Sequence, residues 1–222
     1  FYFTHKPIIW ARNQFNAIGS DNKKELLYLY SLLNSKLNIF LLKSYLMCEN
    51  EKSFLVSISS IKKFIKVPNI TEKNISLKLE IISKAEEMIN MESQQLSDYV
   101  DFSNVLLQKF DNITFEENSL SIQHKGNSVK CEILKNKELI EKSINEKYIN
   151  NLDFKESLIS DLKEIPVYDV DYQMEIKNYI DDLVFALYFN IELDVLGFEN
   201  RERIKEMCSR NEFYLEIGGE EL

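Results

Sequence analysis

The stretch Ile180-Asp181-Asp182-Leu183-Val184-Phe185-Ala186-Leu187-Tyr188 lies near the C-terminus of a chain of 222 residues. Apolar residues in and before this stretch follow the i, i+4, i+7, i+8, i+11 spacing of one helix face: Ile176, Ile180, Leu183, Val184 and Leu187. This period predicts a helix over about 172–189. Side chains of adjacent helix residues point about 100° apart, so the carboxylates of Asp181 and Asp182 do not converge. We expect one solvated acid and one that makes a helix-surface hydrogen bond or ion pair.

The composition favours long helices in a globular chain. Hydrophobic residues make up 45% of it, so a substantial core can form, and only 5 Gly and 3 Pro are present to break helices. Three widely spaced Cys and 2 His offer neither a disulfide framework nor a zinc site, which favours a reducing cytoplasm. No apolar run is long enough for a transmembrane helix, and we expect no signal peptide. The start at Phe1 suggests a piece of a longer protein.

The rest of the chain predicts an α+β fold that is mostly helical. Long helices are expected over about 22–47 and 72–99, and the second has a near-heptad seam that faces another helix of the same chain. That seam consists of Ile75, Leu79, Ile82, Ile89 and Leu96. Short N-terminal strands are expected over 1–11, 54–58 and 65–68, with Ser59 and Ser60 capping a helical turn over 61–64.

The second half of the chain contains alternating apolar and polar residues that predict a small antiparallel β-meander over 113–115, 120–123 and 129–133. Helices are expected at 136–148, 155–163 and 198–210, followed by a frayed acidic tail. The resulting division is a target-recognition part with a basic surface at 1–70, a long helix at 71–104, and a β-meander plus C-terminal helices at 105–222.

Charge is distributed unevenly along the chain. The whole chain has a formal net charge of −9, but residues 1–66 carry ten Lys or Arg against four Asp or Glu. A local excess of about +6 is typical of a surface that meets the phosphates of a nucleic acid. The alternative is that these charges simply face water. If this part of the chain binds DNA, we expect phosphate contacts from six lysines: Lys6, Lys23, Lys24, Lys62, Lys63 and Lys66.

A polar segment follows the only tryptophan, Trp10, and contains Arg12, Asn13, Gln14 and Asn16. Arginine pairs well with guanine edges, and asparagine and glutamine pair with adenine edges. These four residues are therefore candidates for base or groove contacts, although an ordinary polar turn would have the same composition. The sequence has no Gly-rich phosphate loop, no nucleophile elbow and no residue set that we would assign to catalysis.

Three stretches together resemble a known family. They are Tyr28-Leu29-Tyr30-Ser31-Leu32-Leu33-Asn34-Ser35-Lys36-Leu37, Ile58-Ser59-Ser60-Ile61-Lys62 continuing to Pro68, and the helix Ile180 to Tyr188. In this order they resemble the TaqI-like C-terminal specificity domain of adenine-specific DNA methyltransferases in type II and fused type IIG restriction–modification systems. Phe189-Asn190-Ile191 departs from the Gly and Leu that often follow in the family.

The resemblance implies the recognition half of such an enzyme. The family's catalytic Asn-Pro-Pro-Tyr motif and its S-adenosylmethionine site lie in an upstream domain, so this chain would not be an enzyme on its own and would bind no cofactor. Its partners would be double-stranded DNA and the upstream methyltransferase domain, with no membrane partner; the parent enzyme could also carry an endonuclease. The alternatives are a specificity-subunit fragment of a type I system, and a helical protein-interaction module without DNA binding.

Overall fold

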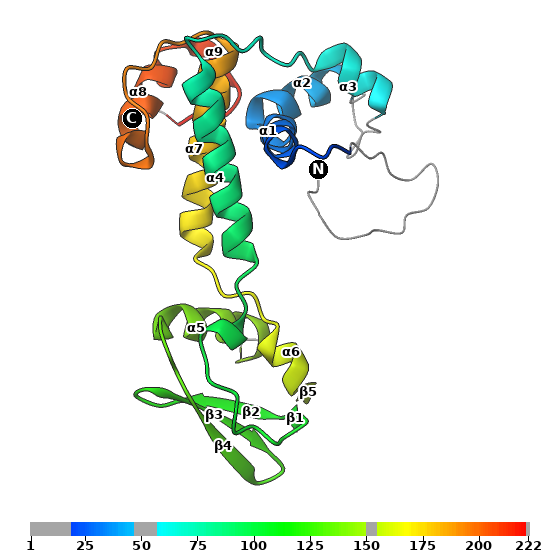
Figure 1. Cartoon of the computed structure of the whole chain (residues 1–222), viewed down its shortest axis with the longest axis vertical. Coiled ribbons are helices and arrows are strands. Elements are labelled where there is room, and N and C mark those ends of the chain that lie inside the picture. Colours follow the sequence, from blue (N-terminus) through cyan, green and yellow to red (C-terminus); the bar gives the residue numbers. More distant parts are fainter. Residues whose placement is uncertain (1–18, 47–56, 150–154, 221–222) are drawn as a thin grey trace. The chain divides into compact units, whose positions relative to one another are not determined.

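The computed structural model describes residues 19–46, 57–149 and 155–220. It has the α+β class predicted from the sequence: helices dominate, and a small antiparallel sheet accompanies them (Figure 1). The expected strand at 1–11 and most of the one at 54–58 lie outside the described residues. The expected strand at 65–68 is wrong, because Ile65 to Pro68 form no strand.

The chain divides into two compact units. Unit 1 comprises Phe1–Glu87 and Met174–Leu222, and unit 2 comprises Met88–Gln173, so the sequence of unit 2 is inserted into that of unit 1. The two boundaries fall within helix α4 (Ile75–Glu92) and helix α7 (Val170–Tyr188). The predicted division at 70 and 104 follows sequence composition, whereas these units follow spatial contacts. The predicted division therefore stays a prediction.

The first predicted helix of unit 1 is broken in two. Helix α1 (Lys23–Asn34) begins at Asn22, whose side chain accepts a hydrogen bond from the Glu25 backbone, and helix α2 (Lys36–Leu46) follows after one residue. That residue, Ser35, has an extended backbone (φ −66°, ψ 147°). Apolar periodicity continues through the break, and this is why the sequence predicted one helix.

Helix α3 (Ile58–Phe64) begins earlier than expected. Its N-cap is Ser57, whose Oγ accepts a hydrogen bond from the Ser60 backbone N–H at 3.0 Å, and not Ser59 or Ser60. Helix α3 packs against α2 through an apolar cluster in which Ile61 of α3 and Ile65, directly after it, meet Leu42 and Leu46 of α2, with Leu33 of α1 beside them. This apolar cluster fixes the two short helices of unit 1 to each other.

Helix α4 ends at Glu92, and its buried face differs from the predicted seam. Ile75 and Leu79 are 40% and 54% exposed. The buried face is instead made by Leu77, Ile81, Ile82 and Ala85. The near-heptad pattern was therefore wrong for the first turns of α4, because the residues that pack follow the 3.6-residue period of one helix and not a coiled-coil seam.

Helix α7 is the most buried element, and its predicted extent of 172–189 is close to the observed one. Its side chains are buried without interruption from Tyr179 to Leu187, and Asp181 and Asp182 are 8% and 4% exposed. The expected solvated acid on this helix is therefore wrong. In unit 1, Tyr179 Oη donates a hydrogen bond to Glu80 Oε1 at 3.3 Å and so joins α7 to α4.

The C-terminal region covers another part of α7. It consists of the 3₁₀ turn η3 (Phe198–Asn200), helix α8 (Arg201–Ser209) and helix α9 (Glu212–Glu216). The predicted helix at 198–210 is confirmed. The expected fraying of the tail is wrong for α9, because Tyr214 is buried and its ring packs edge-on against Phe185 of α7.

Unit 2 contains the predicted β-meander. Strands β2 (Asn112–Phe115), β3 (Ser119–His124) and β4 (Asn127–Glu132) pair antiparallel in the order β2-β3-β4, and a second pair joins β1 (Lys109–Phe110) to β5 (Ser157–Leu158). The helical elements are η1 (Leu96–Asp98), α5 (Lys137–Ile144), the π-helical turn η2 (Asn145–Ile149) and α6 (Ile159–Lys163).

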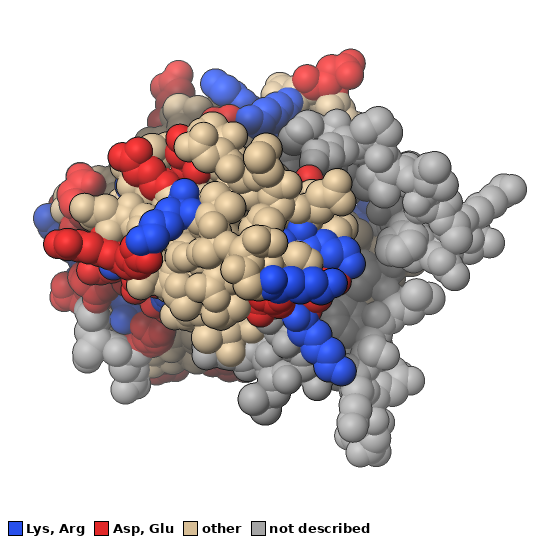
Figure 2. All heavy atoms as spheres, turned by 90° about the horizontal axis from the view of Figure 1, so that it is seen from below, with Lys and Arg blue, Asp and Glu red and all other residues tan. Residues whose placement is uncertain are grey.

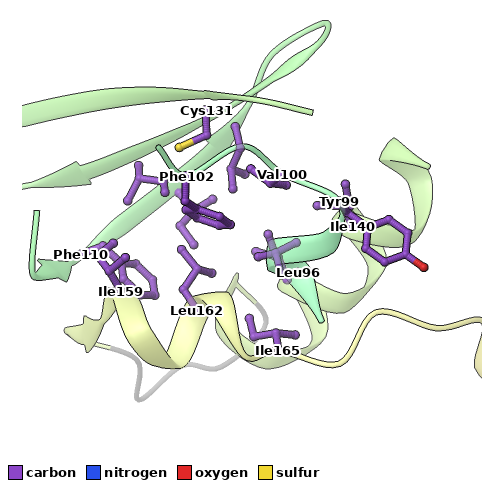
Figure 3. Packing of buried hydrophobic residues seen from close by; sticks show 14 of the residues in the cluster. Leu96, Tyr99, Val100, Phe102, Phe110, Cys131, Ile140, Ile159, Leu162 and Ile165 are labelled. Carbon is purple, nitrogen blue, oxygen red and sulfur yellow. The ribbon is translucent and has the colours of Figure 1, made fainter. Parts of the chain in front are cut away.

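Unit 2 has its own apolar core between the sheet and the helices. Figure 3 shows Leu162 pointing from α6 toward Phe102, Ile165 lying beside Leu96, and Cys131 entering from the sheet. Leu96 belongs to this core and not to a seam along α4. The predicted helices at 136–148 and 155–163 are thus present in shortened form, because β5 and the π-helical turn occupy parts of their ranges.

Candidate nucleic-acid interface

Two of the three stretches that carry the family resemblance meet in unit 1. The break between α1 and α2 is held by Asn38, whose Nδ2 donates to the Leu32 carbonyl at 2.8 Å and to Tyr188 Oη at 3.0 Å. Ser35 Oγ donates to the same carbonyl at 2.7 Å and accepts from the Asn38 backbone N–H at 3.3 Å. The helix that begins in the first stretch is thus bonded to the last residue of the third, 150 positions away.

Asp181 makes the second link between these stretches. Its Oδ1 accepts a hydrogen bond from the Lys36 backbone N–H at 2.8 Å, at the first residue of α2. In most helices the side chain of the N-cap residue accepts such a bond. At α2 the acceptor is instead a carboxylate from another helix, and its negative charge is favourable at a helix N-terminus. Burial nevertheless raises the pKa of Asp181 to about 6. Its other oxygen, Oδ2, has no hydrogen-bond partner among the described residues.

Asp182 points to a different part of unit 1. It accepts a hydrogen bond from Tyr214 Oη of α9, and its backbone carbonyl accepts one from Cys208 Sγ at 3.5 Å. Burial raises the pKa of Asp182 to about 6, and the same cause raises the pKa of Cys208 to about 12. The two carboxylates therefore diverge as predicted. Both serve the packing of α2 and α9 on α7, and they do not form a joint acid pair.

The predicted phosphate-contacting lysines of the second stretch lie on a helix without acidic residues. Helix α3 has the sequence Ile-Ser-Ser-Ile-Lys-Lys-Phe, so Lys62 and Lys63 occupy its last turn, where positive charge is favourable. Both side chains are exposed. Within the described part of the chain, no carboxylate lies within ion-pair distance of either ammonium group. Among the described residues, these two ammonium groups therefore face no carboxylate.

Lys66 lines an open hollow of about 410 Å³ in unit 1. Its other lining residues are mostly polar and uncharged: Val67, Pro68, Asn69, Thr71, Asn74, Leu187, Tyr188 and Asn190. The end of the second stretch, Lys66 to Pro68, therefore lies beside the end of the third stretch, Tyr188. Sequence reasoning included Lys66 but missed the amide and hydroxyl groups opposite it, because no local pattern connects 66–74 with 187–190.

Lys23 and Lys24 lie in the first turn of α1, and their surroundings differ. Lys23 Nζ is 2.5 Å from Glu86 Oε1, and this ion pair lowers the pKa of Glu86. Lys23 would have to exchange a carboxylate for a phosphate in order to bind DNA. Lys24 is exposed and has no ion pair with a described residue. Of the remaining predicted contacts, Lys6, Arg12, Asn13, Gln14 and Asn16 lie outside the described residues.

One face of the molecule is drawn with its charges in Figure 2. Acidic side chains gather toward the left edge, uncharged residues fill the centre, and several Lys and Arg side chains lie to the right of that centre. Basic side chains also lie among the acidic ones on the left, so the described residues on this face form no purely basic surface.

The described residues show no group of three or more His, Cys, Asp or Glu side chains that could hold a metal ion. Nor does any described helix combine the length and the apolar character needed to cross a membrane. Comparisons of the chain with protein-family models, with curated proteins and with solved structures found no match.

Proposed function

We propose that this chain is the DNA sequence-recognition domain of an adenine-specific DNA methyltransferase from a restriction–modification system. In this role it holds duplex DNA for methylation by a catalytic domain upstream, which would bind S-adenosylmethionine. A base that is to be methylated must leave the duplex, so a separate module has to hold the DNA around it.

The observation that supports this proposal best is the meeting of the resembling stretches. Asp181 binds the start of α2, Tyr188 binds Asn38, and Tyr188 shares a hollow with Lys66. Stretches that lie far apart in sequence thus form one local structure, as parts of a single family signature would. Lys62 and Lys63 of α3 lie in one of these stretches, have no carboxylate partner among the described residues, and provide charge for phosphate contacts.

The test measures binding of the chain to duplex DNA as a function of salt concentration. In the variant Lys62→Glu/Lys63→Glu, loss of two phosphate contacts lowers the slope of log affinity against log salt by about 2, since each contact contributes about 0.9. A matched control is Lys137→Glu/Lys142→Glu, which makes the same charge change on α5 of unit 2. The phosphate assignment is wrong if the α3 variant keeps the affinity and slope of the unaltered chain.

A protein-interaction role, or a place in a type I specificity subunit, is the second candidate. It is favoured by the exposed apolar pair Ile75 and Leu79, one turn apart on α4. Sequencing the gene upstream of Phe1 discriminates between the candidates: an Asn-Pro-Pro-Tyr motif there would favour the methyltransferase. Sequencing the methylated bases of cells with and without the intact gene tests whether an adenine motif depends on it.

A further inference from the structure

The structure places an exposed aromatic stack beside the lysines of α3. The rings of Tyr45 in α2 and Phe64 in α3 are nearly parallel, with centroids 4.5 Å apart and an interplanar angle of 9°. Tyr45 is 61% exposed. In a stacked pair each ring covers one face of the other, so this exposure leaves the second face of the Tyr45 ring open to solvent.

The stack is not needed to hold α2 and α3 together. An apolar cluster already makes that contact, through Leu42 and Leu46 of α2, Ile61 of α3 and Ile65 directly after it. An exposed tyrosine added outside this cluster contributes little further burial to folding, whereas a flat ring with one open face is suited to stacking against another flat ring.

The charges around the stack favour an anionic ligand. Neither α2 nor α3 contains an acidic residue, and together they carry the lysines Lys36, Lys43, Lys62 and Lys63. Lys63 Nζ lies over the Phe64 ring, 5.0 Å from its centre. A ligand that stacks on Tyr45 would therefore lie on two helices that carry positive charge and contain no acidic residue. A nucleobase that carries its own phosphates has both features.

We propose that the Tyr45–Phe64 stack is a platform for an unstacked base of DNA, with lysines of α2 and α3 for the phosphates of the same strand. The inference rests on the proposed function and deepens it: the domain would hold the duplex and also bind a base that has left the helix. Every base has a flat π face, so the platform would accept an unpaired base without reading its identity.

The test compares the binding of the full chain to two DNA probes at low salt: a perfect duplex, and the same duplex with one unpaired 2-aminopurine. We expect the second probe to bind about tenfold more tightly, since stacking on one aromatic ring has an effect of this order. The fluorescence of 2-aminopurine should also fall on binding. In Tyr45→Ala both the preference and the quenching disappear while perfect-duplex affinity is kept, and in Tyr45→Trp both remain.

Phe189→Ala is the matched control, because Phe189 is 40% exposed and stacks on Phe185 at 4.3 Å, with no described lysine over its ring. It should leave the preference unchanged. The platform is refuted if the perfect duplex binds but the unpaired base gives no preference. It is also refuted if Phe189→Ala and Tyr45→Ala have the same effect. The proposed DNA-binding function survives both results. If neither probe binds, the proposed function and the platform fail together.

Discussion

Replacing Asp181 separates two effects of one buried carboxylate. Its Oδ1 accepts the hydrogen bond from the Lys36 N–H, and its negative charge is held at 8% exposure. In Asp181→Asn the acceptor oxygen remains and the charge is gone. In Asp181→Ala both are gone. Asp182 is present in all three proteins, but the charge of Asp181 helps to raise its pKa, so both variants also lower the pKa of Asp182.

The magnitude follows from the pKa of Asp181, which burial raises from 3.8 to about 6. A carboxyl with a raised pKa in the folded state stabilises the fold when protonated. This stability is fully present below pH 3.8 and is lost as the pH rises through about 6. A pKa difference of this size corresponds to roughly 3 kcal/mol at pH 7. The lost cap hydrogen bond makes the alanine variant about 1 kcal/mol less stable than the asparagine variant at every pH.

The assay is urea unfolding of the three proteins at pH 4, 5, 6 and 7. Asp181→Asn should be more stable than the unaltered chain at pH 7, and the difference should shrink toward pH 4. The Asn-to-Ala difference should stay constant. If Asp181→Asn is less stable at pH 7 and equal at pH 4, the carboxylate stabilises the fold through its charge, and the account of a desolvated acid is refuted.

Three further outcomes are expected. Phe110→Ala should lower the stability of unit 2 by about 3–5 kcal/mol in urea unfolding, because Phe110 is fully buried in its core; a loss below about 1 kcal/mol would contradict this packing. Tyr188→Phe should lower the stability of unit 1 by about 1 kcal/mol through loss of the bond to Asn38, and an unchanged midpoint would refute that bond's contribution. Cys131 and Cys208, whose pKa values burial raises to about 11 and about 12, should resist alkylation in the native protein at pH 8 and react after unfolding, as followed by peptide mass spectrometry.

The sequence alone was sufficient for elements whose pattern is local. The apolar period around Ile180 predicted α7 to within two residues at each end, and alternating residues between Ile113 and Ile133 predicted the three-stranded meander. In both cases the apolar residues that set the pattern are mostly buried, although α7 is buried on every side from Tyr179 to Leu187.

Tertiary structure decided the features that depend on a partner far along the chain. Ser35 interrupts a helix whose apolar pattern is continuous, and the new helix start is capped by Asp181, 145 residues away from Lys36. The same contact buries Asp181, although the sequence predicted a solvated acid on this helix. No local pattern predicts such a bond, because the acceptor and the donor belong to different elements.

Contacts between distant residues also explain which parts of the candidate interface the sequence predicted and which it did not. Charge and residue type were enough to select Lys62, Lys63 and Lys66. That Lys66 faces a hollow beside Tyr188, and that Tyr45 stacks on Phe64, follows only from the packing of α2, α3 and α7 in unit 1. Composition determines which chemistry a chain can offer, whereas long-range packing determines which of these groups share one surface.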